Sequence, residues 1–320
     1  MSLTEQARAV DAPAPGDEIH ARRRRQPASW VGAAIVAVLA AMLVHTLIRN
    51  PRYQWSVVGD YFTSTQILSG LLQTLELTVL SMLIGIVLGT VLAIMRQSRN
   101  PILSGTAWGY VWFFRGTPLL VQVIFWYNLA SLYPRLSVGI PFGPAFVTAD
   151  ANHLVSRLTA ALLGLGLNQA AYTAEIVRAG ILSVPRGQIE AATALGMTPM
   201  TRMRRIVLPQ AMRVIIPPIG NETIGMLKTT SLVSVLAMPE LLYSAQLIYS
   251  RTYQTMPLLI VASLWYLIVT TVLTLIQTRI EKYFGRGTGR RSSPGAVRRF
   301  GKRAFTFHGA PRVTEGGPTR

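Results

Sequence analysis

Apolar runs of about 20 residues recur along this chain, and they constrain its fold more than any other feature. A helix of that length crosses a hydrocarbon core about 30 Å thick, because each residue adds about 1.5 Å along the axis. Half of the 320 residues are hydrophobic. A water-soluble domain does not repeat such runs. The sequence therefore predicts an all-α membrane protein, a polytopic bundle of about six spanning helices.

Polar and helix-breaking residues set the limits of the predicted spans. Arg115-Gly116-Thr117-Pro118 interrupts one apolar stretch, so we expect a bend there, with a shallow inner segment before it. A short outer or re-entrant helix is expected at 238–249, with Pro239 in its first turn. The glycines of Gly85-x-x-x-Gly89 predict close helix packing. The six spans are expected at about 30–48, 71–95, 117–133, 158–182, 214–236 and 257–278.

Composition divides the chain into four segments. Residues 1–29 and 286–320 are basic and polar, and we expect both to be disordered segments on the cytoplasmic side. Residues 30–65 form an extra first transmembrane helix followed by an external linker. Residues 66–285 form the transmembrane domain proper, with an outer loop near 139–150.

The formal net charge is +18, and its distribution indicates topology. Lysines and arginines concentrate in both terminal segments and around 186–213, whereas the segments between them carry few. This alternation follows the positive-inside rule and places both termini in the cytoplasm. It also favours attraction to anionic membrane lipid. Nucleic acid is therefore not an expected partner, although the total charge would suit one.

Several kinds of chemistry have no residues to support them. The chain has no cysteine, which excludes disulfides and thiolate nucleophiles. Its four histidines form no cluster with carboxylates at metal-ligand spacing, so neither a metal nor another cofactor is expected. No Gly-x4-Gly-Lys-Ser/Thr sequence occurs, so the chain cannot hydrolyse ATP by that route. It is not expected to be an enzyme.

Residues 183–209 lie between two apolar segments, and their local signals predict two short helices with an elbow between them, here called the knob. Pro185 suits a first helical turn, with Ser183 or Val184 as its cap. Residues 186–195 favour helix, and Gly196 can end that helix in a left-handed conformation.

The second arm of the knob restarts at Thr198-Pro199, where threonine caps the helix and proline takes its first position. Residues 200–207 continue it, and Leu208-Pro209 returns the chain to the membrane. The alanine-rich surface of the knob fits a protein groove better than a lipid surface. Docking to another protein is favoured, with an ordinary amphipathic loop on the bilayer as the alternative.

The knob also carries a motif. Glu190-Ala191-Ala192-x3-Gly196-x9-Ile206-x-Leu208-Pro209 resembles the EAA loop of ABC importer permeases. Four further stretches resemble the polar amino-acid permease family, which includes importers of histidine, glutamine, glutamate and arginine. These stretches are 70–77, 115–119, 171–181 and 221–232. The resemblance covers about 66–285, so the first span and the basic tail are additions to the family pattern.

The resemblance implies the fold of a type I ABC importer transmembrane domain in a bacterial inner membrane. It also implies a mechanism. An external amino-acid-binding protein would deliver cargo to two permease subunits, beneath which a dimer of ATPase subunits grips the two EAA loops. In that reading the knob couples ATP hydrolysis to transport. The implied coupling residues are Glu190, Ala191, Ala192, Gly196, Ile206, Leu208 and Pro209.

Polar side chains inside the spans are candidates for the substrate pathway, because a charge at membrane depth needs a partner or water. Asn168, Tyr172 and Glu175 recur at helical spacing and share one face. Asn221, Glu222 and Lys228 belong to the fifth span. The alternative is internal pairing, for example of Glu175 with Lys228 or Arg178. Arg115 either anchors the inner bend, binds lipid phosphate or contacts cargo.

A stand-alone secondary transporter or channel for small polar solutes is the rival interpretation. It would call for inverted repeats or more spans, and the sequence indicates neither. Under either interpretation the particular amino acid or opine remains open, as does the choice between a homodimer and a heterodimer with a sister permease.

Overall fold

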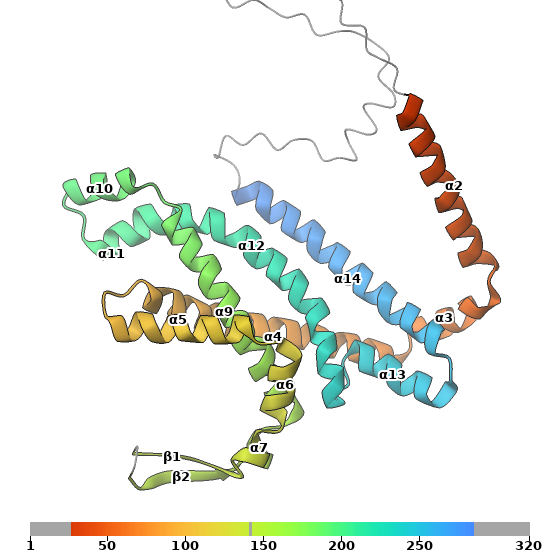
Figure 1. The fold of residues 1–320 in the computed structure, drawn as a ribbon, viewed down its shortest axis with the longest axis horizontal. Coiled ribbons are helices and arrows are strands. Elements are labelled where there is room, and N and C mark those ends of the chain that lie inside the picture. The colour runs from red at the N-terminus through yellow and green to blue at the C-terminus, as the bar shows by residue number, and fades with distance from the viewer. Residues whose placement is uncertain (1–26, 141–142, 285–320) are drawn as a thin grey trace, which may run out of the picture. The chain divides into compact units, whose positions relative to one another are not determined.

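The computed structural model describes residues 27–140 and 143–284, and these are mainly helical (Figure 1). The predicted terminal segments lie outside the described residues, apart from 27–29, which open the first helix. Contacts divide the chain into two units, which separate between Trp55 and Ser56. The described part of the first unit contains helix α2 (Pro27–Arg49) and the 3-10 turn η1 (Pro51–Tyr53).

The second unit holds the remaining elements, which follow in chain order. Its first half contains α3 (Trp55–Phe62), α4 (Thr65–Arg96), α5 (Pro101–Gly116), α6 (Leu119–Tyr127), α7 (Leu129–Leu132), β1 (Arg135–Gly139), β2 (Ala145–Asp150) and α8 (Ala151–Leu154). Its second half contains α9 (Arg157–Leu182), α10 (Arg186–Ala194), α11 (Pro199–Arg202), the π-helical turn η2 (Met203–Val207), α12 (Leu208–Thr229), the 3-10 helix η3 (Thr230–Leu236), α13 (Leu241–Thr252) and α14 (Thr255–Phe284).

The predicted spans differ in how continuous they are. Among the described residues, three segments are long and apolar enough to cross a membrane, namely Trp30–Arg49 within α2, α4 and α14. A fourth is obtained if 199–236 and α13, which meet at a bend of 46°, count as one broken span. Helix α9 has the length, about 39 Å, but it carries several polar and charged side chains. Six continuous apolar spans are therefore not observed.

The third predicted span is broken twice. Helix α5 ends at Gly116, α6 begins at Leu119 and Asn128 separates α6 from α7. Proline 118 has no N–H with which to bond the Phe114 carbonyl one helical turn earlier. The amide of Asn168 on α9 bonds that carbonyl instead, at 2.9 Å. The amide of Gln122 also reaches it at 3.0 Å. The helix break is therefore stabilised by side chains, because the carbonyl that Pro118 leaves without a backbone donor accepts two side-chain hydrogen bonds.

The segment predicted as an outer loop contains a small hairpin. Strands β1 and β2 pair antiparallel, with Arg135 opposite Asp150, and the pairing is irregular between Val138 and Gly139. Asp150 then caps the short helix α8 by accepting a hydrogen bond from the Asn152 amide at 2.8 Å. The all-helical fold that the sequence predicts is confirmed for the bundle and gains this one two-stranded element.

Helices α4 and α9 cross in close contact at the predicted small-residue motif. A Cβ added to Gly85 would lie 2.5 Å from the Gln169 side chain. A Cβ added to Gly89 would lie 2.6 Å from Cβ of Thr173 and 2.8 Å from the backbone carbonyl of Ala170. The close packing expected from Gly85-x-x-x-Gly89 is therefore confirmed.

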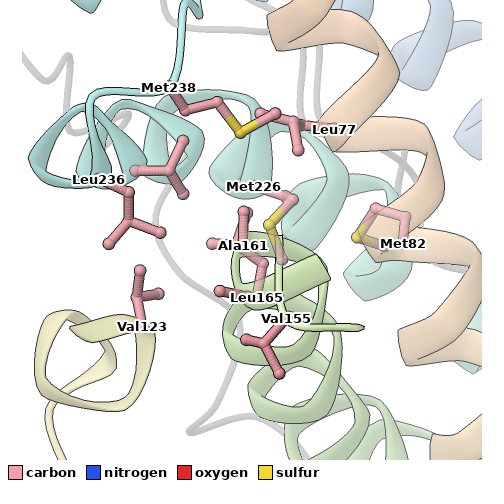
Figure 2. Packing of buried hydrophobic residues seen from close by; sticks show 11 residues of the cluster. Leu77, Met82, Val123, Val155, Ala161, Leu165, Met226, Leu236 and Met238 are labelled. Atoms are coloured by element: carbon pink, nitrogen blue, oxygen red, sulfur yellow. The ribbon is translucent and has the colours of Figure 1, made fainter. Parts of the chain in front are cut away.

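A buried cluster joins five helices around this crossing (Figure 2). Leu77 and Met82 come from α4, and Leu165 comes from α9. Met226 of α12 and Leu236 of η3 lie in the same cluster. Val123 extends it onto α6, so the short helix after the break is held by the same core. This core fixes the frame from which the knob and the polar residues project.

The linker predicted for 49–65 contributes to the core of the second unit. Val58 and Phe62 of α3 belong to a cluster with α13 and α14. The Phe62 and Trp265 rings stack at 4.8 Å, and the Trp265 indole N–H donates to the Phe62 carbonyl at 2.8 Å. Helix α13 begins at Leu241, so Pro239 precedes the helix and does not occupy its first turn as predicted.

Glu240 caps α13 and is a feature that sequence reasoning missed. It is fully buried, and its carboxylate accepts from the backbone N–H groups of Leu242 and Tyr243 at 2.9 and 2.7 Å. The Tyr266 hydroxyl on α14 donates to it at 3.0 Å. Three donors and a helix N-terminus offset part of the cost of burying this carboxylate. The signal in the sequence was a lone glutamate between apolar neighbours.

Candidate functional site

The knob has the two-part form that the sequence predicts, and Figure 1 shows α10 and α11 beyond the ends of α9 and α12. Helix α10 ends in a Schellman motif. Gly196 adopts φ +71°, its N–H bonds the Thr193 carbonyl at 2.9 Å, and the Met197 N–H bonds the Ala192 carbonyl at 3.1 Å. Gly196 thus ends the first arm in the left-handed conformation predicted for it. The start is one residue later than expected, because Pro185 itself is the cap residue.

The second arm begins as predicted. Thr198 caps α11 by accepting from the Thr201 amide at 3.3 Å, and Pro199 takes the first helical position. One side-chain hydrogen bond closes the elbow: a guanidinium N–H of Arg202 donates to the Thr193 hydroxyl at 2.6 Å. The angle between the two arms is therefore held by a cap, a left-handed glycine and a cross-arm bond.

The return to the bundle is continuous helix and has no separate break. Helix α11 passes through η2 into α12, and the Leu208 amide bonds the Met203 carbonyl five residues earlier. Pro209 cannot donate a normal helical hydrogen bond, and its ring crowds the preceding turn. One wide π turn before it accommodates both restrictions. Leu208-Pro209, which the sequence predicts to return the chain to the membrane, lies in a continuous helical connection from the knob into α12.

The predicted coupling residues are not equivalent in the structure. Glu190, Ala191 and Gly196 are exposed on the knob, whereas Ala192 is buried within the chain. Leu208 and Pro209 are exposed and Ile206 is half-buried, all three at the base of the knob. Two residues that the sequence reasoning did not name stand out, because Leu195 is 82% and Met200 66% exposed. The signal in the sequence was a large apolar side chain on each arm of the knob, because exposed apolar side chains that cluster often belong to a binding surface.

The predicted pathway residues fall into separate places. Asn168 is buried at the α5–α6 break, where its amide bonds the Phe114 carbonyl and the Gln122 side chain. Asn221 accepts from the Gln277 amide at 2.9 Å. Glu222, one residue further along α12, is half-buried. Lys228 lines a shallow hollow with Ser231, Ser263 and Tyr266.

Tyr172 and Glu175 do come together, in a cleft between α5 and α9 that we call the polar cleft. Its volume is about 410 Å³. Glu175 pairs with Arg96 of α4 at 2.7 Å and with Arg178 at 2.9 Å. Internal pairing of Glu175, the alternative to substrate contact, is observed with Arg178, whereas the pair with Lys228 is not among the ion pairs of the described residues. Its place is taken by Arg96, which lies 79 residues away in sequence. The cleft is lined by Arg96, Trp108, Val111, Trp112, Arg115, Gly116, Tyr172 and Glu175.

Arg115 brings a further charge to the polar cleft. Its guanidinium carbon lies 5.2 Å from the centre of the Tyr172 ring, a cation–π arrangement. Trp108 and Trp112 stack one helical turn apart, with ring centres 6.3 Å apart, and both rings are exposed. In the described part of the chain, no group of three or more His, Cys, Asp or Glu is placed to hold a metal. The cleft can therefore bind through cations and aromatic faces.

Comparison with known proteins identifies the family to which this fold and sequence belong. Residues 85–286 match the family described as binding-protein-dependent transport system inner membrane component. The chain is 47% identical over 275 residues to the arginine transport system permease protein ArgU of Corynebacterium glutamicum, covering 85% of both. It is 39% identical over 214 residues to the histidine/lysine/arginine/ornithine transport system permease protein HisM of Escherichia coli, covering 67% of this chain and 87% of that protein.

A solved structure agrees with the sequence relatives. The crystal structure of an amino acid ABC transporter with histidines contains a chain that is 36% identical, with a TM-score of 0.58. The match covers 68% of this chain and 94% of that one.

The fold and the knob are therefore those of a membrane subunit of an ABC importer. The chain belongs to the family of binding-protein-dependent transport system inner membrane components. The resemblance drawn from the motifs is confirmed, together with the type I importer fold. The chain is a transport subunit, and the ATP hydrolysis that drives transport belongs to a partner chain.

Proposed function

We propose that this chain is the permease subunit through which an ABC importer carries a basic amino acid, such as arginine, into the cell. The observation that carries the proposal is the 47% identity to a permease named for arginine, along 85% of both chains. The second relative is also named for a system that includes arginine. The aligned length with the first relative exceeds that of 66–285, so the similarity extends beyond the shared permease core.

We propose that the knob is the contact for the ATPase subunits, with Glu190, Ala191 and Gly196 on the contacting surface. Leu195 and Met200 add the apolar area that such a contact needs. Ala192 shapes α10 from within, because its side chain is buried. Ile206, Leu208 and Pro209 transmit movement into α12 through the continuous helix at η2. This geometry supports a lever that turns a span when the ATPase dimer closes.

The remaining partners follow from the family. A binding protein on the outer side would deliver the cargo, and a second permease, identical or a sister chain, would complete the pathway. We place the protein in a bacterial inner membrane as a multi-pass subunit, with membrane lipid around it and both termini in the cytoplasm. The domain division at 29, 65 and 285 belongs to this proposal. Support for the orientation comes from the basic residues around the knob.

Substrate movement is proposed to involve Tyr172, Glu175, Asn221, Glu222 and Lys228. Asn168 acts by positioning, because its amide is committed to the Phe114 carbonyl and to Gln122. Tyr172 is the residue of this group that lines the polar cleft with an exposed ring. Asn221, Glu222 and Lys228 are spread along α12 and would meet cargo at other depths.

Reconstitution tests the proposal. The chain is co-expressed with its ATPase, incorporated in vesicles and supplied with the binding protein and radiolabelled amino acids. We expect ATP-dependent accumulation of arginine, with competition by lysine and ornithine and little by glutamate. Accumulation of arginine by vesicles containing this chain alone would instead support the stand-alone transporter, and preference for an acidic or apolar amino acid would overturn the cargo class.

The knob is tested by Glu190→Lys. Reversing this exposed charge puts an unfavourable group at the ATPase contact, at a cost of about 2 kcal/mol or more, so uptake should fall about 30-fold or more. Membrane insertion should be unchanged. Gln188→Lys is the control, because it introduces the same residue, with a charge change of +1 in place of +2, at an exposed position of α10 on a different side. Equal uptake by both variants and the unmodified protein would contradict the docking role.

A further inference from the structure

The helix that continues the knob has a weak point at two consecutive prolines. Pro217 and Pro218 lie inside α12, and neither has an N–H with which to bond the carbonyl one helical turn earlier. Missing hydrogen bonds of this kind are a common cause of bending in long helices. A movement that enters α12 from the knob would therefore be absorbed by bending at the prolines, unless another element supports them.

One side chain of α14 supports this point. Helices α12 and α14 run side by side (Figure 1). The Gln277 amide nitrogen donates to the Pro217 carbonyl at 3.2 Å and to the Asn221 side-chain oxygen at 2.9 Å. Gly220 allows this approach, because a Cβ added there would lie 3.0 Å from the amide carbon of Gln277. Gln277 therefore bridges the two helices beside the proline pair.

The rest of the second half of α14 has little other support. From 263 to 284, Gln277 is the one buried residue. Beside it, α4, α9, α12 and α14 line an apolar pocket of about 450 Å³, whose walls include Met212, Ile216 and Ile276. Helices with few buried contacts move relative to their neighbours more easily than closely packed ones. The Gln277 contact is therefore the specific link between these parts of α12 and α14.

The hydrogen bonding of Gln277 is not what selection for stability alone would favour. Its nitrogen also lies 2.8 Å from Oε1 of Glu281, so two protons serve three acceptors. Its buried carbonyl oxygen has no donor among the described residues. An apolar side chain of similar size would fill the space without a buried, unpaired acceptor. Residues that break such a rule are expected at functional positions.

We propose that Gln277 is a positioning residue for energy coupling, which ties α14 to α12 at the proline pair so that both helices move together when the knob turns. This inference rests on the proposed contact of the knob with the ATPase and deepens it, because the moving part then includes the last helix. Without the tie, α12 bends at Pro217 and Pro218. ATP hydrolysis then continues while less of the movement reaches the transport pathway.

Gln277→Met tests the tie, because it keeps the length of the side chain and removes its donors. The permease–ATPase complex is reconstituted in vesicles with the binding protein, and arginine uptake and ATP hydrolysis are measured on the same preparation. We expect the number of ATP molecules hydrolysed per arginine to rise about fivefold or more, with little change in the denaturant midpoint of unfolding. Thr278→Val is the control, because it removes an exposed hydroxyl that bonds the Thr274 carbonyl within α14. It should leave the ratio unchanged.

Gly220→Ala disturbs the same contact from α12. The added Cβ displaces the Gln277 amide, so the ratio should rise although Gln277 itself is retained. Combined with Gln277→Met, the two effects should not add, because both break one contact. Gly225→Ala is the matched control, since it lies on the same helix and its Cβ meets nothing within 4 Å. Equal ratios in the two glycine variants, or additive effects in the double variant, would contradict the proposed tie.

Spin labels follow the movement directly. The chain has no cysteine, so Val214→Cys on α12 and Leu275→Cys on α14 give one labelled pair per permease at exposed positions. With Gln277 present and a cysteine-free ATPase, we expect the same distance in the nucleotide-free and ATP-bound complexes. With Gln277→Met, the ATP-bound complex should show a second, shifted distance. A distance that changes with nucleotide while Gln277 is present overturns the inference.

The uptake measurements separate this inference from the proposed function. If the complex with the unmodified chain accumulates no basic amino acid with ATP, the proposed function itself fails. If it does accumulate arginine and Gln277→Met keeps the ratio of ATP to arginine, this inference alone is wrong. A joint fall in uptake, hydrolysis and the midpoint of unfolding would assign Gln277 a purely structural role and would likewise overturn it.

Discussion

The knob and the α4–α9 crossing show two different ways of fixing a helix. In the knob, each arm is defined by residues close to it in sequence, namely Gly196 at the elbow and Thr198 as cap. At the crossing, Gly85 and Gly89 matter because of residues about 80 positions away on α9. The knob is exposed and can contact a partner protein, whereas the crossing is buried and fixes the positions of α4 and α9. Local geometry therefore shapes the surface for which we propose a coupling role, whereas long-range packing holds the bundle together.

Enlarging the crossing should have the largest effect on stability. Gly89→Ala places a methyl group 2.8 Å from the Ala170 carbonyl and 2.6 Å from Thr173, so the two helices must separate. We expect a loss of about 1–3 kcal/mol in the free energy of unfolding, as for other overpacked sites. Denaturant unfolding of the purified chain in detergent measures it.

Gly105→Ala is the matched control for the crossing. Gly105 lies on α5, and a Cβ there meets nothing within 4 Å. This substitution should be neutral or stabilise the chain by about 0.5–1 kcal/mol through helix propensity. If both glycine variants unfold alike, the close approach of α4 and α9 is not what holds the frame.

Changing the elbow of the knob should have a smaller effect on stability but a direct effect on transport. Gly196→Ala forces a Cβ into the left-handed conformation at φ +71°, at a cost of about 1–2 kcal/mol. The side chain meets no neighbour there, so the cost is one of backbone conformation alone. ATP-driven uptake should fall while unfolding of the bundle hardly changes.

Gly187→Ala is the control for the elbow variant, because it replaces a glycine of the knob that does not lie at the elbow. Gly187 lies in the first turn of α10, has no positive φ and has open space for a methyl group. Its uptake should equal that of the unmodified protein. Comparable losses in the two variants would show that the angle of the elbow is not the critical property.

Removal of the cap should have the smallest effect of the three. Thr198→Ala deletes the acceptor for the Thr201 amide and should destabilise α11 by about 1 kcal/mol. Faster hydrogen exchange of the amides in 199–202, with no change in α4 or α9, is the expected result. Thr198→Ser retains the hydroxyl and should exchange like the unmodified protein. Faster exchange throughout the bundle would contradict the local character of the knob.

Sequence reasoning succeeded where the determinants are local. Both arms of the knob and the left-handed glycine were predicted within a residue or so. The end of α9 at Leu182 was likewise correct. Predictions failed where a partner far away in sequence decides. The Glu175–Arg96 pair and the Asn168 bond to the Phe114 carbonyl join residues 79 and 54 positions apart. No periodicity or spacing in a single chain encodes which helix lies beside which.

The sequence by itself determined that this chain is a helical membrane bundle with a bent, capped knob, because apolar length, caps and glycine conformations act over a few residues. Only the tertiary structure decided which polar groups are already satisfied and which remain free. Glu175 is paired with two arginines, whereas Arg115 forms no ion pair or side-chain hydrogen bond within 27–140 and 143–284 and faces the ring of Tyr172. The difference arises because hydrogen bonding and charge pairing depend on distances in space, and helix packing sets those distances.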